Sequence, residues 1–275
     1  MTLAAGRRPF RGPGLGVGFG AAATALYVGF IGLPVAALMV RALQQESFFS
    51  SVTGGQALTA LKLSLVTSAL SMVVIVLVGT PFAYLLARKS SPILKVVDSL
   101  VELPIVLPPV VTGVAMLMAF GRQGIVGPAL EDAGITLPFT TVAVIFAQLF
   151  VASPFYVRAA KLGFQSVALD YEEVSQTLGV SPWWTFWRLT LPLATPSILT
   201  GLALAWARAV SEFGATIMFA GNLTGKTQTM PLAIMTAMES SLDTALALSV
   251  LLMAGSVALL AALGLVARHR WQGRL

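Results

Sequence analysis

Residues 64–87 read SLVTSALSMVVIVLVGTPFAYLLA, a stretch of 24 residues that contains no charged side chain. A helix needs about 20 predominantly apolar residues to cross the hydrocarbon core of a bilayer. This stretch therefore predicts a membrane-spanning helix. Lys62 precedes it and Arg88 follows it, so basic residues stand at both ends.

Five further windows have the same length and apolar character, and they cover residues 20–40, 100–120, 139–159, 197–219 and 244–267. Together with their loops, the six windows use nearly the whole chain, which leaves no room for a sizeable soluble domain. We predict an all-α integral membrane bundle of about six transmembrane helices. We expect it to form one transmembrane domain over residues 1–275.

The composition agrees with this fold class. Of the 275 residues, 57% are hydrophobic and only 10% are charged, and the mean hydropathy is +0.87. A soluble domain usually carries about 25% charged residues, so a water-soluble enzyme and a disordered chain are both excluded. The chain has no cysteine and a single histidine, His269. We therefore expect no disulfide, no metal site and no catalytic residue.

The basic residues predict the orientation. With the N-terminus inside, 12 of the 17 Lys and Arg residues lie in segments on the cytoplasmic side. Such a bias is typical of inner-membrane proteins, and it places both termini in the cytoplasm. Arg7 and Arg8 could also begin a signal peptide. However, the following apolar run is too long, and Pro34 and Arg41 stand where a cleavage site would be expected.

The third window is interrupted by proline. It opens with the sequence Glu-Leu-Pro-Ile-Val-Leu-Pro-Pro at residues 102–109, and proline removes a backbone donor and kinks a helix. One interpretation is a kink needed for packing. The other is a broken helix that lines a translocation pathway, with Pro108, Pro109 and Thr112 as candidate lining residues.

The predicted cytoplasmic loop over residues 158–192 is long for a simple connection. Val167, Tyr171, Val174 and Leu178 recur at helical spacing. Asp170 is a candidate N-cap, and a glutamate three positions later completes a capping box. Gly179 then supplies a left-handed helix end.

A second short helix is predicted from Ser181-Pro182, with serine as N-cap and proline in the first turn. Trp183, Trp184 and Trp187 follow, and such residues also suit a membrane interface. For the two helices as a whole, a docking surface for a cytoplasmic partner is the favoured interpretation.

The loop resembles the EAA loop of ABC importer permeases. The resemblance rests on Glu173-Val174-Ser175, on Gly179 and on Leu189-Thr190-Leu191-Pro192, whose spacing matches the family pattern throughout, although Val174 and Ser175 replace two alanines. The resemblance implies that this helix docks onto an ATP-hydrolysing subunit. The residues expected to dock are Asp170, Glu172, Glu173, Val174, Ser175, Leu178 and Gly179. Glu173 could instead act only in helix capping.

The fifth window contains a charged pair. Arg208 and Glu212 are four residues apart, so they share a face of the predicted helix. A structural ion pair is one interpretation, because mutual pairing lowers the cost of charge in a membrane. The other is that Arg208 also attracts an anion along the pathway, with Ser211 and Thr216 as hydroxyl donors.

The sequence resembles molybdate-type permeases in particular. The resemblance is carried by residues 103–111, 121–127, 208–216 and 219–222, and it covers about residues 61–260. Ser211 departs from the glycine that is usual before Glu-Phe-Gly. Sulfate permeases are close relatives of this group, so the family is fixed more firmly than the anion.

Residues 221–227, Gly-Asn-Leu-Thr-Gly-Lys-Thr, look like a phosphate-binding P-loop. That motif requires four residues between its glycines, and here there are three. Nucleotide binding by this chain is therefore not expected. The chain is predicted to be a transport subunit rather than an enzyme, with no cofactor of its own and with ATP and magnesium bound by the partner ATPase.

The favoured hypothesis is a permease subunit of a binding-protein-dependent importer for molybdate or tungstate in the inner membrane. By the resemblance, its partners are a pair of ATP-binding subunits, a second copy of the permease, an extracytoplasmic oxyanion-binding protein and membrane lipid, but no nucleic acid. The alternatives are a sulfate permease, a stand-alone carrier driven by an ion gradient and a structural membrane anchor. Neither the carrier nor the anchor explains the loop over residues 158–192.

Overall fold

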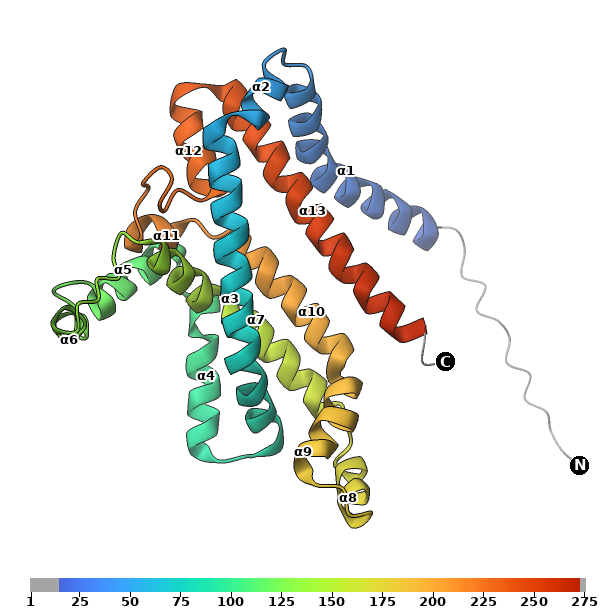
Figure 1. The fold of residues 1–275 in the computed structure, drawn as a ribbon. Helices are drawn as coiled ribbons and strands as arrows, with labels where there is room; N and C mark the ends of the chain where they lie inside the picture. The colour runs from blue at the N-terminus through green and yellow to red at the C-terminus, as the bar shows by residue number, and fades with distance from the viewer. Residues whose placement is uncertain (1–14, 273–275) are drawn as a thin grey trace, which may run out of the picture.

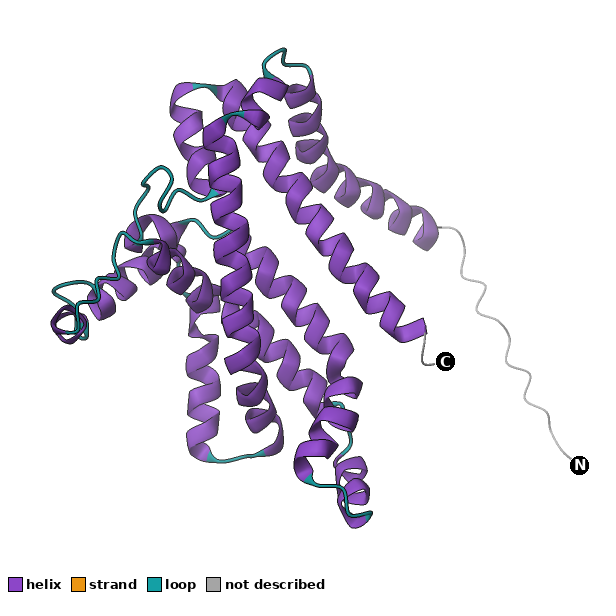
Figure 2. Cartoon of the chain, viewed as in Figure 1, coloured by secondary structure: helices purple, strands orange, loops and turns teal. Residues whose placement is uncertain are grey.

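The computed structural model describes residues 15–272, and this part of the chain consists of helices joined by loops (Figures 1 and 2). The all-α prediction is confirmed. The elements are α1 (Leu15–Leu43), α2 (Phe48–Thr53), α3 (Gly55–Arg88), α4 (Pro92–Val106), α5 (Pro109–Phe120), α6 (Gly127–Asp132), α7 (Thr141–Gln165), α8 (Leu169–Thr177), α9 (Pro182–Thr185), the π-helix η1 (Phe186–Thr190), α10 (Leu191–Val210), α11 (Gly214–Phe219), α12 (Met230–Ser240) and α13 (Leu242–Gln272).

The centre of the bundle is made by α3, α7 and α10, which pack along most of their lengths. Their contact surfaces are built on small residues. A Cβ added at Gly201 of α10 would lie 2.6 Å from Cβ of Ala159 on α7. The Tyr156 hydroxyl, which is buried, lies 2.6 Å from the hydroxyl of Thr80 on α3. Without a hydrophobic driving force between helices, close backbone approach and interhelical hydrogen bonds hold membrane helices together.

Five helical stretches in the described part are long and apolar enough to span a membrane: Gly18–Leu43, Gly55–Arg88, Thr141–Gln165, Pro182–Val210 and Leu242–Ala262. Each overlaps one of the predicted windows, although Pro182–Val210 shares only residues 197–210 with the window 197–219. The third window, 100–120, is two shorter helices, α4 and α5, separated at Leu107 and Pro108. The prolines thus separate two helices rather than kink one, and the lining of a pathway stays a prediction.

The fifth window is also broken, which the sequence analysis did not predict. A continuous helix over 197–219 is wrong, because α10 ends at Val210 and α11 begins at Gly214. The predicted loop over 158–192 is shorter than expected as well, since α7 continues to Gln165. Helix α12, which packs on α13 and α3, was not predicted at all.

In Figure 1, α8, α9 and the α3–α4 connection lie at one end of the bundle, and α2 and α12 lie at the other. Helices α5 and α11 meet between these ends. We refer below to the first of these ends as the α8 end. Helix α1 contacts mainly α13, and Ala42 is the one buried residue among those of its candidate span Gly18–Leu43.

Replacement of Gly201 by alanine tests the close packing of α10 on α7. The added methyl group overlaps Ala159 and approaches the Tyr156 carbonyl oxygen at 3.2 Å, and overpacking of this kind costs about 1–3 kcal/mol. We expect a lower thermal unfolding midpoint of the purified protein in detergent. Gly255→Ala in α13 is the matched control, because a Cβ there meets no described atom within 4 Å. An equal loss of stability in both variants would contradict the packing.

Candidate functional site

Helix α8 ends at a left-handed glycine, as predicted. Gly179 has φ +83°, its N–H donates to the Gln176 carbonyl, and the Val180 N–H donates to the Ser175 carbonyl. This pair of bonds is the Schellman arrangement, which satisfies the last carbonyls of a helix. A side chain at this position would be strained because L-residues rarely adopt such a conformation.

The predicted start of this helix is wrong. The N-cap is Ala168, helix α8 begins at Leu169, and no side-chain capping bond forms among the described residues. Asp170 lies inside the first turn, so it acts on the helix dipole rather than as a cap. Glu173 is therefore not part of a capping box, and the capping interpretation of this residue is removed.

The outer face of α8 is exposed. Asp170 and Glu173 are exposed, and so are Tyr171, Val174 and Leu178, with exposed fractions of 58%, 57% and 78%. We call these five residues the outer face of α8. It combines an apolar strip with two carboxylates, and a strip of this kind at one end of a membrane bundle marks a surface that another protein can cover.

Glu172 points the other way, into the chain. One of its carboxylate oxygens, Oε1, lies 2.6 Å from Arg88 Nη2 and accepts from Arg88 Nε at 3.1 Å and from the Thr190 hydroxyl at 2.8 Å. The other oxygen accepts from the Tyr84 hydroxyl at 3.2 Å. The Arg88 and Glu172 side chains are only 11% and 9% exposed. Glu172 is therefore hydrogen-bonded to α3 and η1, and it is not available on the outer face for the docking role that was predicted for it.

The second short helix packs beside the first. Ser181 is the N-cap of α9, as predicted, although its side chain makes no capping bond among the described residues. The hydroxyl of Ser175 on α8 lies 2.9 Å from that of Thr185 on α9. Ser175 is thus half-buried between the two helices.

The aromatic residues here separate into two groups. Phe186 packs inward, with its ring centroid 5.0 Å from that of Tyr84 and 6.0 Å from that of Phe164. The tryptophans at 183, 184 and 187 are 66%, 50% and 47% exposed. The inner group completes the packing of α9 and η1 on α3 and α7.

A second site lies where the two broken helices meet. A Cβ added at Gly214, the first residue of α11, would lie 2.5 Å from Cβ of Pro109, the first residue of α5. Only glycine permits this approach. The two helix breaks, at 107–108 and at 211–213, are therefore brought into contact.

Arg208 and Glu212 form an ion pair at this junction, with Nη2 and Oε2 2.7 Å apart. The Glu212 side chain is fully buried, while that of Arg208 is 27% exposed. The other oxygen of Glu212 accepts from the Ala215 N–H at 2.8 Å, in the first turn of α11. The prediction of a structural ion pair is confirmed, and Glu212 also bonds the backbone that the break leaves free.

The remaining candidate pathway residues differ in exposure. Pro108, Pro109 and Ser211 are exposed. Thr112 and Thr216 are buried, and their hydroxyl oxygens have no hydrogen-bond partner within residues 15–272. Buried polar groups normally find a partner, and these two hydroxyls have none among the described residues.

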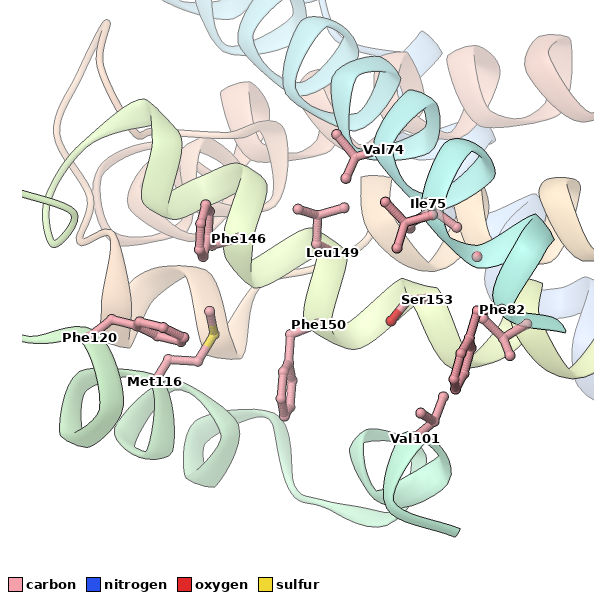
Figure 3. A pocket seen from close by; sticks show the side chains of 13 residues that line it. Val74, Ile75, Phe82, Val101, Met116, Phe120, Phe146, Leu149, Phe150 and Ser153 are labelled. Atoms are coloured by element: carbon pink, nitrogen blue, oxygen red, sulfur yellow. The ribbon is translucent and has the colours of Figure 1, made fainter. Parts of the chain in front are cut away.

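A cavity of about 390 Å³ lies between α3, α4, α5 and α7 (Figure 3). Its walls are apolar, and Ser153 supplies the only polar side chain among the lining residues: Val74, Ile75, Val78, Gly79, Phe82, Val101, Met116, Phe120, Phe146, Leu149, Phe150, Ser153 and Val157. An anion would lose its hydration there without compensation. This cavity is therefore not an anion site.

Comparison with known proteins decides the family. Residues 79–272 match the model of the "Binding-protein-dependent transport system inner membrane component". The chain belongs to this family. The matched region runs from within α3 to the end of α13, so it includes α8, both helix breaks and α12.

Two relatives indicate which members of the family this chain resembles. The chain is 44% identical over 239 residues to the molybdenum transport system permease protein ModB of Mycobacterium bovis, which covers 87% of this chain and 89% of the relative. It is 35% identical over 237 residues to the sulfate transport system permease protein CysW of Synechococcus elongatus, covering 85% and 82%.

The fold is that of solved ABC transporters. A bacterial transporter that imports the acidic polysaccharide alginate gives a TM-score of 0.71 at 18% identity and covers 93% of this chain and 95% of its own. The same kind of transporter in complex with its alginate-bound periplasmic protein gives 0.69, covering 93% of each chain. The chain is a multi-pass inner-membrane component of an ABC importer and resembles molybdate permeases.

Sequence reasoning missed three partners of Glu172, namely Tyr84, Arg88 and Thr190. Arg88 was used only for the orientation of the chain. Helical spacing places Glu172 on the side of α8 opposite Val174, but the contact with Arg88 joins residues 84 apart in the sequence, so no local signal could have found it.

Truncation of Arg208 tests the ion pair at the junction. Arg208→Met leaves the fully buried Glu212 without its cation, so we expect a loss of about 2–3 kcal/mol, somewhat below that of a fully buried pair because Arg208 is partly exposed. Arg208→Met combined with Glu212→Gln removes both charges and should recover much of this loss. The measurement is thermal unfolding of the purified protein in detergent. Glu212→Gln alone is measured as well. If the loss of stability in the double variant equals the sum of the losses in the two single variants, the ion pair contributes nothing to stability.

Proposed function

We propose that this chain is the permease subunit of an ATP-driven importer that moves molybdate or tungstate into the cytoplasm. The observation that carries the proposal is the 44% identity, over most of both chains, to a molybdenum transport permease. Membership of the importer family favours this function over an ion-coupled carrier. A sulfate permease is the second candidate, because the sulfate relative covers 85% of the chain at 35% identity.

The outer face of α8 is proposed to dock onto the ATPase. Its apolar residues and the carboxylates of Asp170 and Glu173 are exposed, so a partner could reach them. Gly179 ends the helix and turns the chain back toward the membrane. The bias of basic residues would place this end in the cytoplasm, with both termini, where ATP and magnesium are available to a separate subunit.

The translocation pathway is proposed to run past the junction of the two helix breaks, between two copies of this chain. Broken helices are tolerated within a membrane where they border a cavity or protein, and transporters use them at substrate sites. Arg208 would offer a partly exposed guanidinium to the oxyanion there, with Ser211, Thr112 and Thr216 as hydroxyl donors. Pro108 and Pro109 would keep the start of α5 separate from the end of α4.

ATP binding would draw the two ATPase subunits together and move the docked α8 helices. The permease would then open outward to accept the anion from an extracytoplasmic binding protein, and hydrolysis would return it to the inward state. Such a switch requires partners that bind the two states with different affinities.

Uptake into vesicles tests the function. The vesicles hold this chain with its candidate ATPase, and the candidate binding protein is supplied on the outside. We expect uptake of labelled molybdate that requires ATP and is competed by tungstate but not by sulfate. ATP-dependent uptake of sulfate instead would support the second candidate. Uptake that does not require ATP would contradict the proposal of an ATP-driven importer.

Gly179→Ala tests docking at α8. A left-handed alanine costs about 1–2 kcal/mol, which should unwind the end of α8 and reduce both ATP-dependent uptake and the amount of ATPase that co-purifies. Gly134→Ala is the matched control, because Gly134 has φ +73°, is also unobstructed by described atoms, and lies after α6, away from α8. Equal losses of co-purified ATPase in the two variants would contradict the docking role.

A further inference from the structure

Two segments at the α8 end, α3 and η1, bond to one carboxylate that α8 carries. Arg88 is the last residue of α3, Thr190 is the last residue of η1 before α10, and Glu172 lies on α8 between them in sequence. Arg88 also donates to the Val167 carbonyl at 3.2 Å, so it holds the segment that leads into α8. Each oxygen of the carboxylate has at least one donor.

Thr190 reaches this carboxylate from the last position of a π-helix. The Leu191 N–H donates to the Phe186 carbonyl, one residue further back than in an α-helix. A helical threonine commonly bonds the carbonyl four residues back, as Thr195 does to Leu191 in α10. Thr190 instead donates to Glu172 across the gap between η1 and α8. Single π turns of this kind are frequent at functional positions.

The pair is costly to separate. Both side chains are nearly buried, and separation of a buried ion pair leaves a charge without compensation. The aromatic contacts of Tyr84 with Phe164 and Phe186 pack beside the same network. Helix α8 is therefore held to α3 and η1 more firmly than by loop contacts alone.

We propose that Glu172 is a positioning residue that makes α8, the end of α3 and the start of α10 move as one body. A displacement of α8 is then passed to two helices at once. Helix α10 carries it to the Arg208–Glu212 junction, and α3 carries it along α7. This inference rests on the proposed docking of an ATPase at the outer face of α8, but it assigns a different task to Glu172, which does not itself dock.

The test measures how many anions enter per ATP hydrolysed, in the reconstituted complex with molybdate as the probe. In Glu172→Gln the outer face of α8 is unchanged, so we expect the ATPase to co-purify and to hydrolyse ATP. The number of molybdate ions taken up per ATP should fall about tenfold, an ordinary size for a coupling between two sites. A purely structural role would lower the amount of complex but not this ratio.

Thr190→Val is a milder variant that keeps volume and both charges. It removes one hydrogen bond to the carboxylate, and we expect the ratio to fall about fivefold, the equilibrium effect of one typical hydrogen bond. Thr195→Val is the matched control, because the hydroxyl of Thr195 bonds only within α10. The control should keep the wild-type ratio.

A spin label gives a second readout. The chain has no cysteine, so Gln176→Cys, an exposed position one turn after Glu172 in α8, can be labelled alone. The label should become more mobile in Glu172→Gln and in Thr190→Val, and not in Thr195→Val.

The outcomes separate the two proposals. If the unaltered complex shows no ATP-dependent uptake of molybdate or sulfate, the proposed function fails. If the unaltered complex transports but Thr190→Val and Glu172→Gln keep its ratio of uptake to hydrolysis, the positioning role of Glu172 is overturned. If Glu172→Gln does not assemble, the comparison of Thr190→Val with Thr195→Val decides.

Discussion

The buried contact between Glu172 and Arg88 is the interaction on which the α8 end of the molecule depends. Without it, α8 would keep the bonds of the same carboxylate to Tyr84 and Thr190 and the contact of Ser175 with Thr185, but the buried guanidinium of Arg88 would lose its carboxylate. With it, the carboxylate connects α8 to the last residue of α3 and to the residue that precedes α10. The outer face of α8 can therefore contact a partner while the helix stays attached to α3 and to the start of α10.

The same physical rule governs the middle of the bundle. A membrane supplies no water to bond the backbone groups that a broken helix exposes, so a break must be buried against protein. Here the break before α5 lies against the break before α11, and Glu212 accepts from the first turn of α11 while pairing with Arg208. The structure thus leaves the guanidinium of Arg208 partly exposed beside the break before α11, where the passage of an anion is proposed.

Features that depend on local sequence could be predicted. The apolar windows identified the long helices, Pro108 identified the first break, and Gly179 identified the end of α8, because length, a missing donor and a left-handed glycine are local properties. The break at 211–213 could not be predicted, since no proline marks it and it is held by contacts with Pro109 and Arg208. Glu172 was placed with the docking residues for the same reason: its burial depends on Arg88, 84 residues away.

The central claim is that the outer face of α8 meets an ATPase while its inner face stays bonded to the bundle. Site-specific cross-linking tests this most directly, because the chain has no cysteine. A photoreactive thiol reagent attached at Leu178→Cys on the outer face should cross-link the ATPase subunit in the assembled complex. The same reagent at Leu242→Cys, which is also exposed and lies at the start of α13, should not. A cross-link to the ATPase from Leu242→Cys and none from Leu178→Cys would contradict the account.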